Sequence, residues 1–424
     1  MAEGRVPKEC IVVGAGLAGL NCAKHLQESG YEIHVLEASD GIGGRVRTDK
    51  VEGFLLDRGF QVLQTAYPAA RETLDYDALH LVELEPGAVV RCDGRWERMS
   101  DPQRRPRHAF RTVFNKIGDL RDRFRLLGLR SGAHRSSIEG HLSRSPDRRI
   151  GEVLRKDYGF SESFISSFMR PWLSGMFLES DLGTSANYFH FVFKMLSEDR
   201  IAYPKAGMQT IPDQLAQGFR KQIRLGAQVD EVHSKSVRLV GGEVLEADAV
   251  VIATDMSSAA RLTDEVLARK WNSTVCQYYV ADEPPTSEAS LMLNGEGATD
   301  GPVNHVFVAT NSVPELSPDH RALISVSMVG DADPGSLEQK VRDQMQGWFG
   351  QSVSGWRFLG EYRIPHALPS QEPGFWREVS PVDENGIFRC GDYMTTGSIQ
   401  GALESGKQAA MAVIESTGVP MATS

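Results

Sequence analysis

The chain has 424 residues, which at roughly 150 residues per domain predicts two or three domains. Its 41% hydrophobic and 24% charged residues are typical of a folded globular protein and exclude a disordered or collagen-like chain. A net charge of −10 opposes general affinity for nucleic acid, and we expect no such partner. The five cysteines are scattered and lack C-x-x-C spacing, so we expect a reducing compartment and no metal site.

Hydrophobic segments long enough for targeting or insertion are missing from the sequence. Only nine residues precede the first apolar run at 10–13, so we expect no signal or transit peptide. No stretch reaches 18 uninterrupted apolar residues, so no membrane span is expected. These features predict a cytoplasmic protein.

A short apolar run and three glycines form the first recognisable unit. Residues 10–13 are expected to form a β-strand, and Gly14, Gly16 and Gly19 follow ahead of apolar residues at helical spacing. Gly14 permits a turn, Gly16 lets backbone amides approach a pyrophosphate, and Gly19 lets helix and strand pack closely. Strand, glycine turn and helix together predict a dinucleotide-binding unit with the phosphates at the helix N-terminus.

A second strand at 33–36 ends at Glu37, whose carboxylate can accept hydrogen bonds from ribose hydroxyls. A second glycine-rich loop then ends in a guanidinium suited to phosphate, and its relevant residues are Ala38, Gly43, Gly44 and Arg45. Residues 11–45 resemble the flavin-containing amine oxidase superfamily, which includes monoamine oxidases, protoporphyrinogen oxidases and phytoene desaturases. In that superfamily the pattern E-A-x-x-x-x-G-G-R contacts FAD.

The resemblance extends to the middle and the end of the chain. Residues 57–59 look like the family's D-x-G segment, residues 223–232 like the strand pair beside the adenine, and residues 387–410 like the segment that closes the FAD site. The resemblance therefore implies further FAD-binding positions, namely Gly59, Val229, Gly391, Asp392, Ser398 and Ile399. No cysteine lies in the loop that follows Asp392 and contains Ser398, so noncovalent FAD is expected.

Dispersed FAD segments imply a discontinuous domain. We expect an α/β chain with a Rossmann-like FAD-binding domain over 1–85, 205–265 and 380–424, and an α+β substrate-binding domain over 86–204 and 266–379. No second G-x-G-x-x-G with strand and helix flanks exists, so a separate NAD(P)H domain is not expected. Reduced flavin would then pass its electrons to oxygen, a quinone or another diffusible acceptor.

Positive charge is concentrated in one segment. Residues 98–149 carry 14 Lys and Arg against 5 acids, a net charge of +9 that leaves −19 for the remainder. Apolar residues recur there at helical spacing: Phe110, Val113, Phe114, Ile117, Leu120, Phe124 and Leu127. We favour a helix that packs this apolar face inward. Peripheral contact with an anionic membrane remains the open alternative, as does an acidic substrate or partner. The oligomeric state is not predicted.

Candidate catalytic and substrate residues follow from the resemblance. Amine-oxidising relatives carry a lysine where this chain has Thr274, and two aromatic cage residues where it has Leu368 and Ser398. Without a cage for an ammonium group, an amine substrate is disfavoured. His366 is the only imidazole expected near the flavin and is a candidate for proton transfer, with a structural role as the alternative. Phe177 belongs to an apolar stretch that can line a substrate tunnel.

These features predict an FAD-dependent oxidoreductase that removes hydride from a small apolar or conjugated substrate, similar to the phytoene desaturase and protoporphyrinogen oxidase branch. Two alternatives remain. One is an amine oxidase with a non-standard substrate cage, and the other is a redox-neutral FAD-dependent isomerase or a non-catalytic flavin-binding protein.

Glu37→Ala should weaken FAD binding, because the ribose hydroxyls lose their acceptor. The flavin absorbance of the purified variant, compared with that of the wild type at equal protein concentration, measures the occupancy. Unchanged occupancy would contradict the assignment of Glu37.

Overall fold

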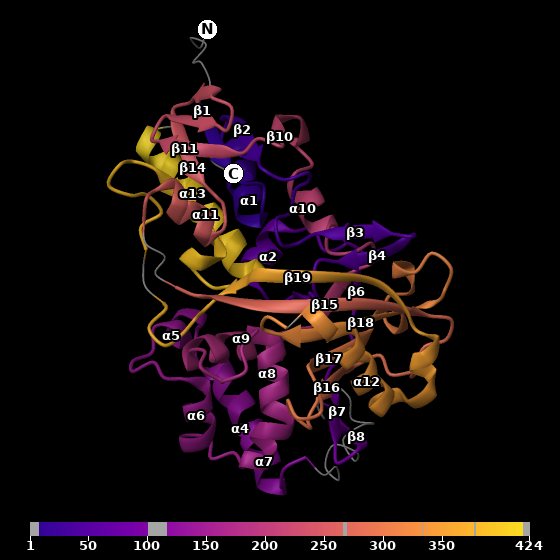
Figure 1. Cartoon of the computed structure of the whole chain (residues 1–424). Coiled ribbons are helices and arrows are strands. Elements are labelled where there is room, and N and C mark those ends of the chain that lie inside the picture. The colour runs from indigo at the N-terminus through magenta and orange to yellow at the C-terminus, as the bar shows by residue number, and fades with distance from the viewer. Residues whose placement is uncertain (1–7, 101–116, 266–268, 333, 377–378, 419–424) are drawn as a thin grey trace.

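The computed structural model describes residues 8–100, 117–265, 269–332, 334–376 and 379–418 (Figure 1). Strands and helices alternate near the N-terminus, whereas the middle of the chain contains a helical cluster followed by long strands. The first described strand, β1 (Glu9–Val13), and the last described helix, α13 (Ile399–Thr417), lie at the upper end of the molecule in Figure 1. Within the described ranges, no helix combines the length and apolarity needed to cross a bilayer.

A five-stranded parallel sheet forms one end of the molecule. Its order is β10 (Ile223–Leu225), β2 (Glu32–Glu37), β1 (Glu9–Val13), β14 (Ala249–Ile252) and β20 (Phe388–Arg389). All of β14 is buried, as expected for a central parallel strand. Helices α1 (Leu17–Glu28) and α13 (Ile399–Thr417) pack against each other beside this sheet.

Smaller sheets and helices adjoin the parallel sheet. The glycine pair at 241–242 turns the chain between β12 (Ser236–Leu239) and β13 (Val244–Glu246), which pair antiparallel. The other members are β11 (Val229–His233), β3 (Thr48–Val51), β4 (Phe54–Asp57), β5 (Leu63–Gln64), β6 (Leu81–Glu83) and β9 (Ile201–Pro204), with α2 (Pro68–Thr73), α10 (Thr210–Leu215) and α11 (Met256–Leu262).

A seven-stranded mixed sheet forms the second large layer. Its order is β19 (Arg357–Pro369), β15 (Trp271–Ala281), β18 (Ala322–Val329), β17 (Val303–Val308), β16 (Leu291–Asn294), β7 (Ala88–Cys92) and β8 (Arg95–Met99). Side chains alternate between its two faces. One face packs against α12 (Leu337–Phe349) through an apolar cluster that includes Val306, Val326 and Trp348. The opposite face contacts α8 (Arg170–Phe177).

Helices fill the remaining corner of the molecule (Figure 1). Besides α8, they are α4 (Leu120–Arg135), α5 (Ile138–Leu142), α6 (Ile150–Lys156), α7 (Glu162–Phe164) and α9 (Ala186–Glu198), with a π-helical turn at Ile165–Met169 between α7 and α8. The architecture confirms the predicted α/β fold class with additional strand-rich and helical parts.

Helix α4 corrects one expectation about the basic segment. Ile117 is buried, but Leu120, Phe124 and Leu127 are exposed rather than packed inward. The reason is the rotation of the helix, because Leu129 and Ala133 take the buried side instead. Phe110, Val113 and Phe114 lie outside the described residues.

Close packing of α1 on α13 depends on a glycine. A Cβ at Gly406 would lie 2.3 Å from the carbonyl oxygen of Ala18 and 3.1 Å from the amide nitrogen of Cys22. The two helix backbones therefore approach each other as closely as they do only because residue 406 has no side chain. This contact joins the first helix of the chain to the last.

Gly406→Ala should destabilise the fold by about 1–3 kcal/mol, because the added methyl group pushes α13 away from α1. Gly347→Ala in α12 is the matched control, since a Cβ there meets no heavy atom within 4 Å. The control should be neutral or stabilising by up to about 1 kcal/mol. Thermal and denaturant unfolding measure both effects, and equal behaviour of the two variants would contradict this account of the helix contact.

Candidate functional site

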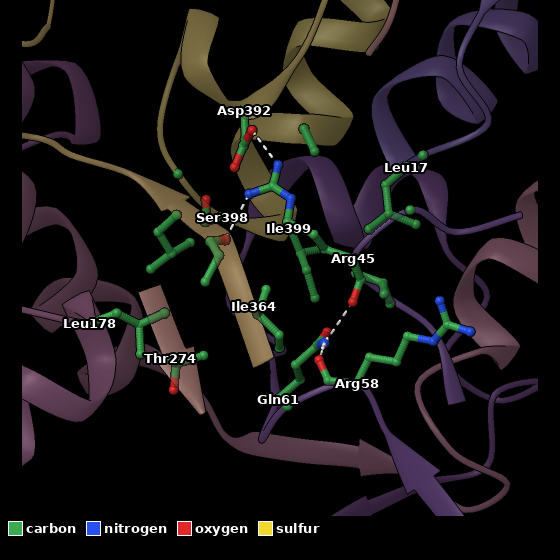
Figure 2. A pocket seen from close by; sticks show the side chains of 18 of the residues that line it. Leu17, Arg45, Arg58, Gln61, Leu178, Thr274, Ile364, Asp392, Ser398 and Ile399 are labelled. Carbon is green, nitrogen blue, oxygen red and sulfur yellow. Dashed lines mark hydrogen bonds and ion pairs between the residues drawn. The ribbon is translucent and has the colours of Figure 1, made fainter. Parts of the chain in front are cut away.

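A cavity of about 1030 Å³ extends between the parallel sheet, the seven-stranded sheet and the helical cluster. Its walls come from segments that are far apart in the sequence (Figure 2). Loops that follow β1 and β2 line one end, together with the N-terminus of α13. Residues of β15 to β19, α8 and α9 line the other end.

The first glycines build a cradle at the end of β1. Gly14 has φ +110°, and a Cβ there would lie 2.7 Å from the carbonyl oxygen of Ala253, so glycine is required. Gly16 is the residue before α1, and a Cβ there meets no heavy atom within 4 Å. Gly19 faces inward instead, where a Cβ would lie 2.0 Å from the carbonyl oxygen of Gly14. The cavity is thus open beside the N-terminus of α1, where a phosphate binds favourably.

Backbone amides hold the carboxylate at the end of β2. The amide of Ala15 donates to Glu37 at 2.8 Å, and the amide of Ser39 donates to its other oxygen at 2.9 Å. Each carboxylate oxygen has more than one lone pair, so both can still accept a ligand hydroxyl. The loop after Glu37 is held to the cradle by a 2.8 Å hydrogen bond from the Gly43 amide to the Ala15 carbonyl.

Arg45 connects three distant segments of the chain. Its Nη2 donates to Asp392 at 2.6 Å, and its Nη1 donates to the carbonyl of Ala367 at 2.8 Å (Figure 2). The guanidinium also lies over the ring of Trp271, 5.7 Å from its centroid. Burial alone would lower the pKa of Arg45, but the Asp392 carboxylate raises it. A fixed positive charge therefore faces the cavity.

The N-terminus of α13 points toward the same end of the cavity. The Ser398 hydroxyl accepts a hydrogen bond from the Gly401 amide at 3.1 Å and so caps the helix. Of the fourteen residues matched to the family's FAD contacts, Gly19 packs behind the cavity wall. The other thirteen line the cavity: Gly14, Gly16, Glu37, Ala38, Gly43, Gly44, Arg45, Gly59, Val229, Gly391, Asp392, Ser398 and Ile399.

Apolar side chains dominate the other end of the cavity. The helices α8 and α9 contribute Trp172, Met176, Val192 and Leu196, and the facing strands contribute Leu291, Leu293 and Phe307. Aromatic rings also reach the cavity from other positions: Phe60, Tyr67, Tyr188 and Tyr362. This wall suits a large apolar group.

Four of the five proposed catalytic and substrate positions line the cavity. Thr274 does so, although its hydroxyl donates to the carbonyl of Met328 at 2.7 Å. Leu368 and Ser398 also line it. His366 lies at an exposed part of the wall, stacked on Trp271 with ring centroids 4.9 Å apart.

Phe177 is the position that does not line the cavity. Its ring is buried in the core, 5.4 Å from the ring of Tyr188. The neighbouring residues Met176 and Leu178 form the cavity wall in its place. The α-helical turn around residue 177 directs these side chains in different directions, so a tunnel residue could not be chosen from composition alone.

His305 is a site residue that the sequence analysis did not predict, because no sequence motif marks its strand as part of the site. It lines the cavity from β17, so the expectation that His366 is the only nearby imidazole is wrong. The Asn304 amide nitrogen donates to the carbonyl of Pro171 at 3.0 Å and contacts His305 Nδ1 at 3.2 Å. Nδ1 is therefore an acceptor and Nε2 carries the proton. Burial lowers the pKa of His305 to about 4, so the ring is neutral at pH 7.

A buried carboxyl supports the turn at Gly59. Asp57 accepts hydrogen bonds from the Thr48 hydroxyl at 2.5 Å, from the Met208 amide at 3.2 Å and from the Tyr203 hydroxyl. Burial raises the pKa of Asp57 to about 6, against the lowering effect of these hydrogen bonds. The strand that carries Gly59 to the cavity is anchored by this group.

Comparison with known proteins agrees with this geometry. Residues 17–414 match the family described as "Flavin containing amine oxidoreductase". The chain belongs to this family. The match covers both ends of the cavity and confirms the family resemblance inferred from the sequence.

Individual amine oxidoreductases are similar to this chain at low identity. The L-amino acid oxidase Lm29 of Lachesis muta is 24% identical over 61% of this chain and 53% of its own length. The zeta-carotene-forming phytoene desaturase of Myxococcus xanthus is 28% identical over 61% of this chain and 55% of its own. The matched part thus spans about half the length of these relatives. The structure of cyclohexylamine oxidase from Brevibacterium oxydans IH-35A superposes with a TM-score of 0.73 at 18% identity, covering 97% of this chain and 100% of that one, and shows the same fold.

Asp57→Asn should change how the stability of this protein depends on pH. The pKa of Asp57 is higher in the folded state, about 6, than its ordinary value of 3.8, so its protonated form stabilises the fold at low pH and this contribution is lost as the pH rises through about 6. Relative to Asp57→Asn, the wild type should lose about 3 kcal/mol of unfolding free energy between about pH 4 and pH 7.

Denaturant unfolding across this pH range measures the difference. The control is Asp77→Asn, which changes an exposed carboxylate. The unfolding free energy of the wild type is compared with that of Asp57→Asn at each pH. If the difference between them stays constant with pH, the raised pKa of the buried carboxyl is contradicted.

Proposed function

We propose that this protein is an FAD-dependent oxidoreductase that oxidises or desaturates a small apolar or conjugated substrate. The observation that supports it best is the continuity of one cavity, lined by the glycine cradle at one end and by apolar side chains at the other. A substrate held at the apolar end would share this enclosed space with the cofactor. Electrons would leave to oxygen, a quinone or another diffusible acceptor.

FAD fits the polar end of the cavity. The open space beside Gly16 at the N-terminus of α1 suits the pyrophosphate, and Glu37 at the end of β2 suits the adenosine ribose. Val229 is the first residue of β11 and comes shortly after β10, which is the neighbour of β2 in the parallel sheet. It lines the cavity and suits the adenine side of the site. Noncovalent attachment stays a prediction, made because the loop that contains Ser398 has no cysteine.

Bound FAD supplies the hydride acceptor. The protein's own residues bind, orient and exclude water. The N-terminus of α13, capped by Ser398, places a partial positive charge at the cavity and favours negative charge there. At the same end, Arg45 presents a guanidinium held in place by the Asp392 carboxylate, while Trp172, Met176 and Phe307 keep the substrate end apolar.

Oxidation of an amine is the second candidate. The positions of the family's cage, Leu368 and Ser398, are not aromatic, but Tyr362 on β19 and Phe60 in the loop after β4 also line the cavity. An aromatic surface for an amine therefore exists at other positions than those expected. Relatives named for L-amino acid and cyclohexylamine oxidation also favour testing this chemistry.

Anaerobic mixing of the purified holoprotein with substrates separates these functions. Bleaching of the flavin absorbance by polyenes or porphyrinogens, but not by amines, is the expected result. Bleaching by amines alone would contradict oxidation of an apolar substrate and support amine oxidation, the second candidate. A flavin that no substrate reduces would contradict oxidoreductase function and favour a redox-neutral role.

A narrowed cavity tests where the substrate binds. Val192→Phe in α9 should slow flavin reduction by the active substrate at least about tenfold, because the larger ring occupies the apolar end. Val240→Phe on an exposed turn is the control for the substitution itself. The reduction rates are compared only if both variants contain the same amount of flavin. An unchanged reduction rate in Val192→Phe would show that the substrate does not bind at this apolar end.

A further inference from the structure

The surface of α4 carries three large apolar side chains in a row. Leu120 is 57% exposed, Phe124 is 72% exposed and Leu127 is 46% exposed. Their spacing of four and three residues places them along one ridge of the helix. We call Leu120, Phe124 and Leu127 the α4 ridge.

The ridge faces outward because the opposite side of α4 is firmly held. Leu129 and Ala133 are buried in the main apolar core. At the start of the helix, Asp119 and Asp122 form reciprocal hydrogen bonds with each other's backbone amides. Asp122 is also fully buried and accepts from the Ser161 hydroxyl at 2.6 Å. Rotation of α4 to hide the ridge would break these contacts.

Positive charge surrounds the ridge. Helix α4 contains the five arginines Arg121, Arg123, Arg125, Arg130 and Arg135. Its only carboxylate is the buried Asp122, which pairs with Arg125 at 3.2 Å and leaves the helix with a net positive charge. The whole chain carries −10, so this helix differs in sign from the protein as a whole. An exposed apolar ridge with arginines on its flanks matches the two layers of an anionic membrane surface, namely apolar acyl chains and negatively charged headgroups.

We propose that α4 docks this protein onto anionic lipid membranes, with the α4 ridge inserted among the headgroups. A second copy of the chain suits the ridge less well. Three side chains on one helix are far fewer than the roughly 20–30 residues a side of a stable protein interface, and two copies of α4 would bring like charges together. The acidic remainder of the molecule would be repelled by the same membrane, which favours one orientation.

Docking through α4 would bring the bilayer close to the apolar end of the cavity. Helix α4 packs against α9, and α9 lines the cavity through Tyr188, Val192 and Leu196. In Figure 1, α4 lies at the end of the molecule opposite the parallel sheet. An apolar substrate dissolved in lipid would then be near its site. This consequence rests on the proposed function, whereas membrane binding itself does not.

Sedimentation of the full-length holoprotein with lipid vesicles tests the proposal without any substrate. The protein should bind vesicles of phosphatidylcholine mixed with phosphatidylglycerol, and should bind pure phosphatidylcholine vesicles much less, with binding weakened by salt. The triple variant Leu120→Ser, Phe124→Ser, Leu127→Ser should bind at least about tenfold more weakly. Arg121→Gln should weaken binding about fivefold.

A matched control uses exposed apolar residues outside α4. Val240 and Val244, at the β12–β13 turn, are 59% and 58% exposed, so Val240→Ser, Val244→Ser removes apolar surface of a similar kind. This double variant should bind as the wild type does. As a second readout, the fluorescence of Phe124→Trp should shift to shorter wavelength when anionic vesicles are added, as the indole enters the headgroup region.

Three results would overturn the proposal. One is the absence of wild-type binding to anionic vesicles. Another is equal loss of binding in the control double variant. The third is a wild-type dimer that the triple variant converts to a monomer, which would make the ridge an interface between copies. Flavin reduction is measured without vesicles. None of these three results therefore bears on the proposed oxidoreductase function, which is tested separately.

Discussion

The ion pair between Arg45 and Asp392 is the interaction on which the site depends most. One guanidinium joins the loop after β2, the turn before α13 and, through the Ala367 carbonyl, strand β19. Arg45 lies more than three hundred residues from both partners in the sequence, yet the three segments together enclose the polar end of the cavity. Because Asp392 is buried, losing either partner would leave an unpaired charge in the site.

The two ends of the cavity are built by different means. The polar end consists largely of backbone, since the glycines and the N-termini of α1 and α13 direct amides toward the ligand. The apolar end consists of side chains from α8, α9 and the seven-stranded sheet. Backbone amides recognise phosphates whatever the reaction is, whereas substrate choice varies with side chains. One fold can therefore serve relatives named for amino acid oxidation and for carotene desaturation.

Helix α4 shows how a helical pattern can be recognised while its orientation is not. Its apolar residues satisfy two periodic ridges, one containing Leu129 and Ala133 and the other containing Leu120 and Phe124. Packing against the core selects the first ridge, because the capping box and the buried Asp122 hold the helix in that rotation. The second ridge stays exposed, and it is the surface for which we propose docking to anionic membranes.

The sequence alone determined the nucleotide half of this protein. Its recognition depends on local order, with a strand, a glycine turn, a helix and a terminal carboxylate within residues 10–45, and such short-range patterns are independent of how distant segments meet. Tertiary structure alone decided the substrate half. His305 enters the cavity and Phe177 leaves it because of strand pairing and helix rotation, which depend on contacts between residues far apart in the chain. No local pattern encodes those contacts, so they could be established only from the folded molecule.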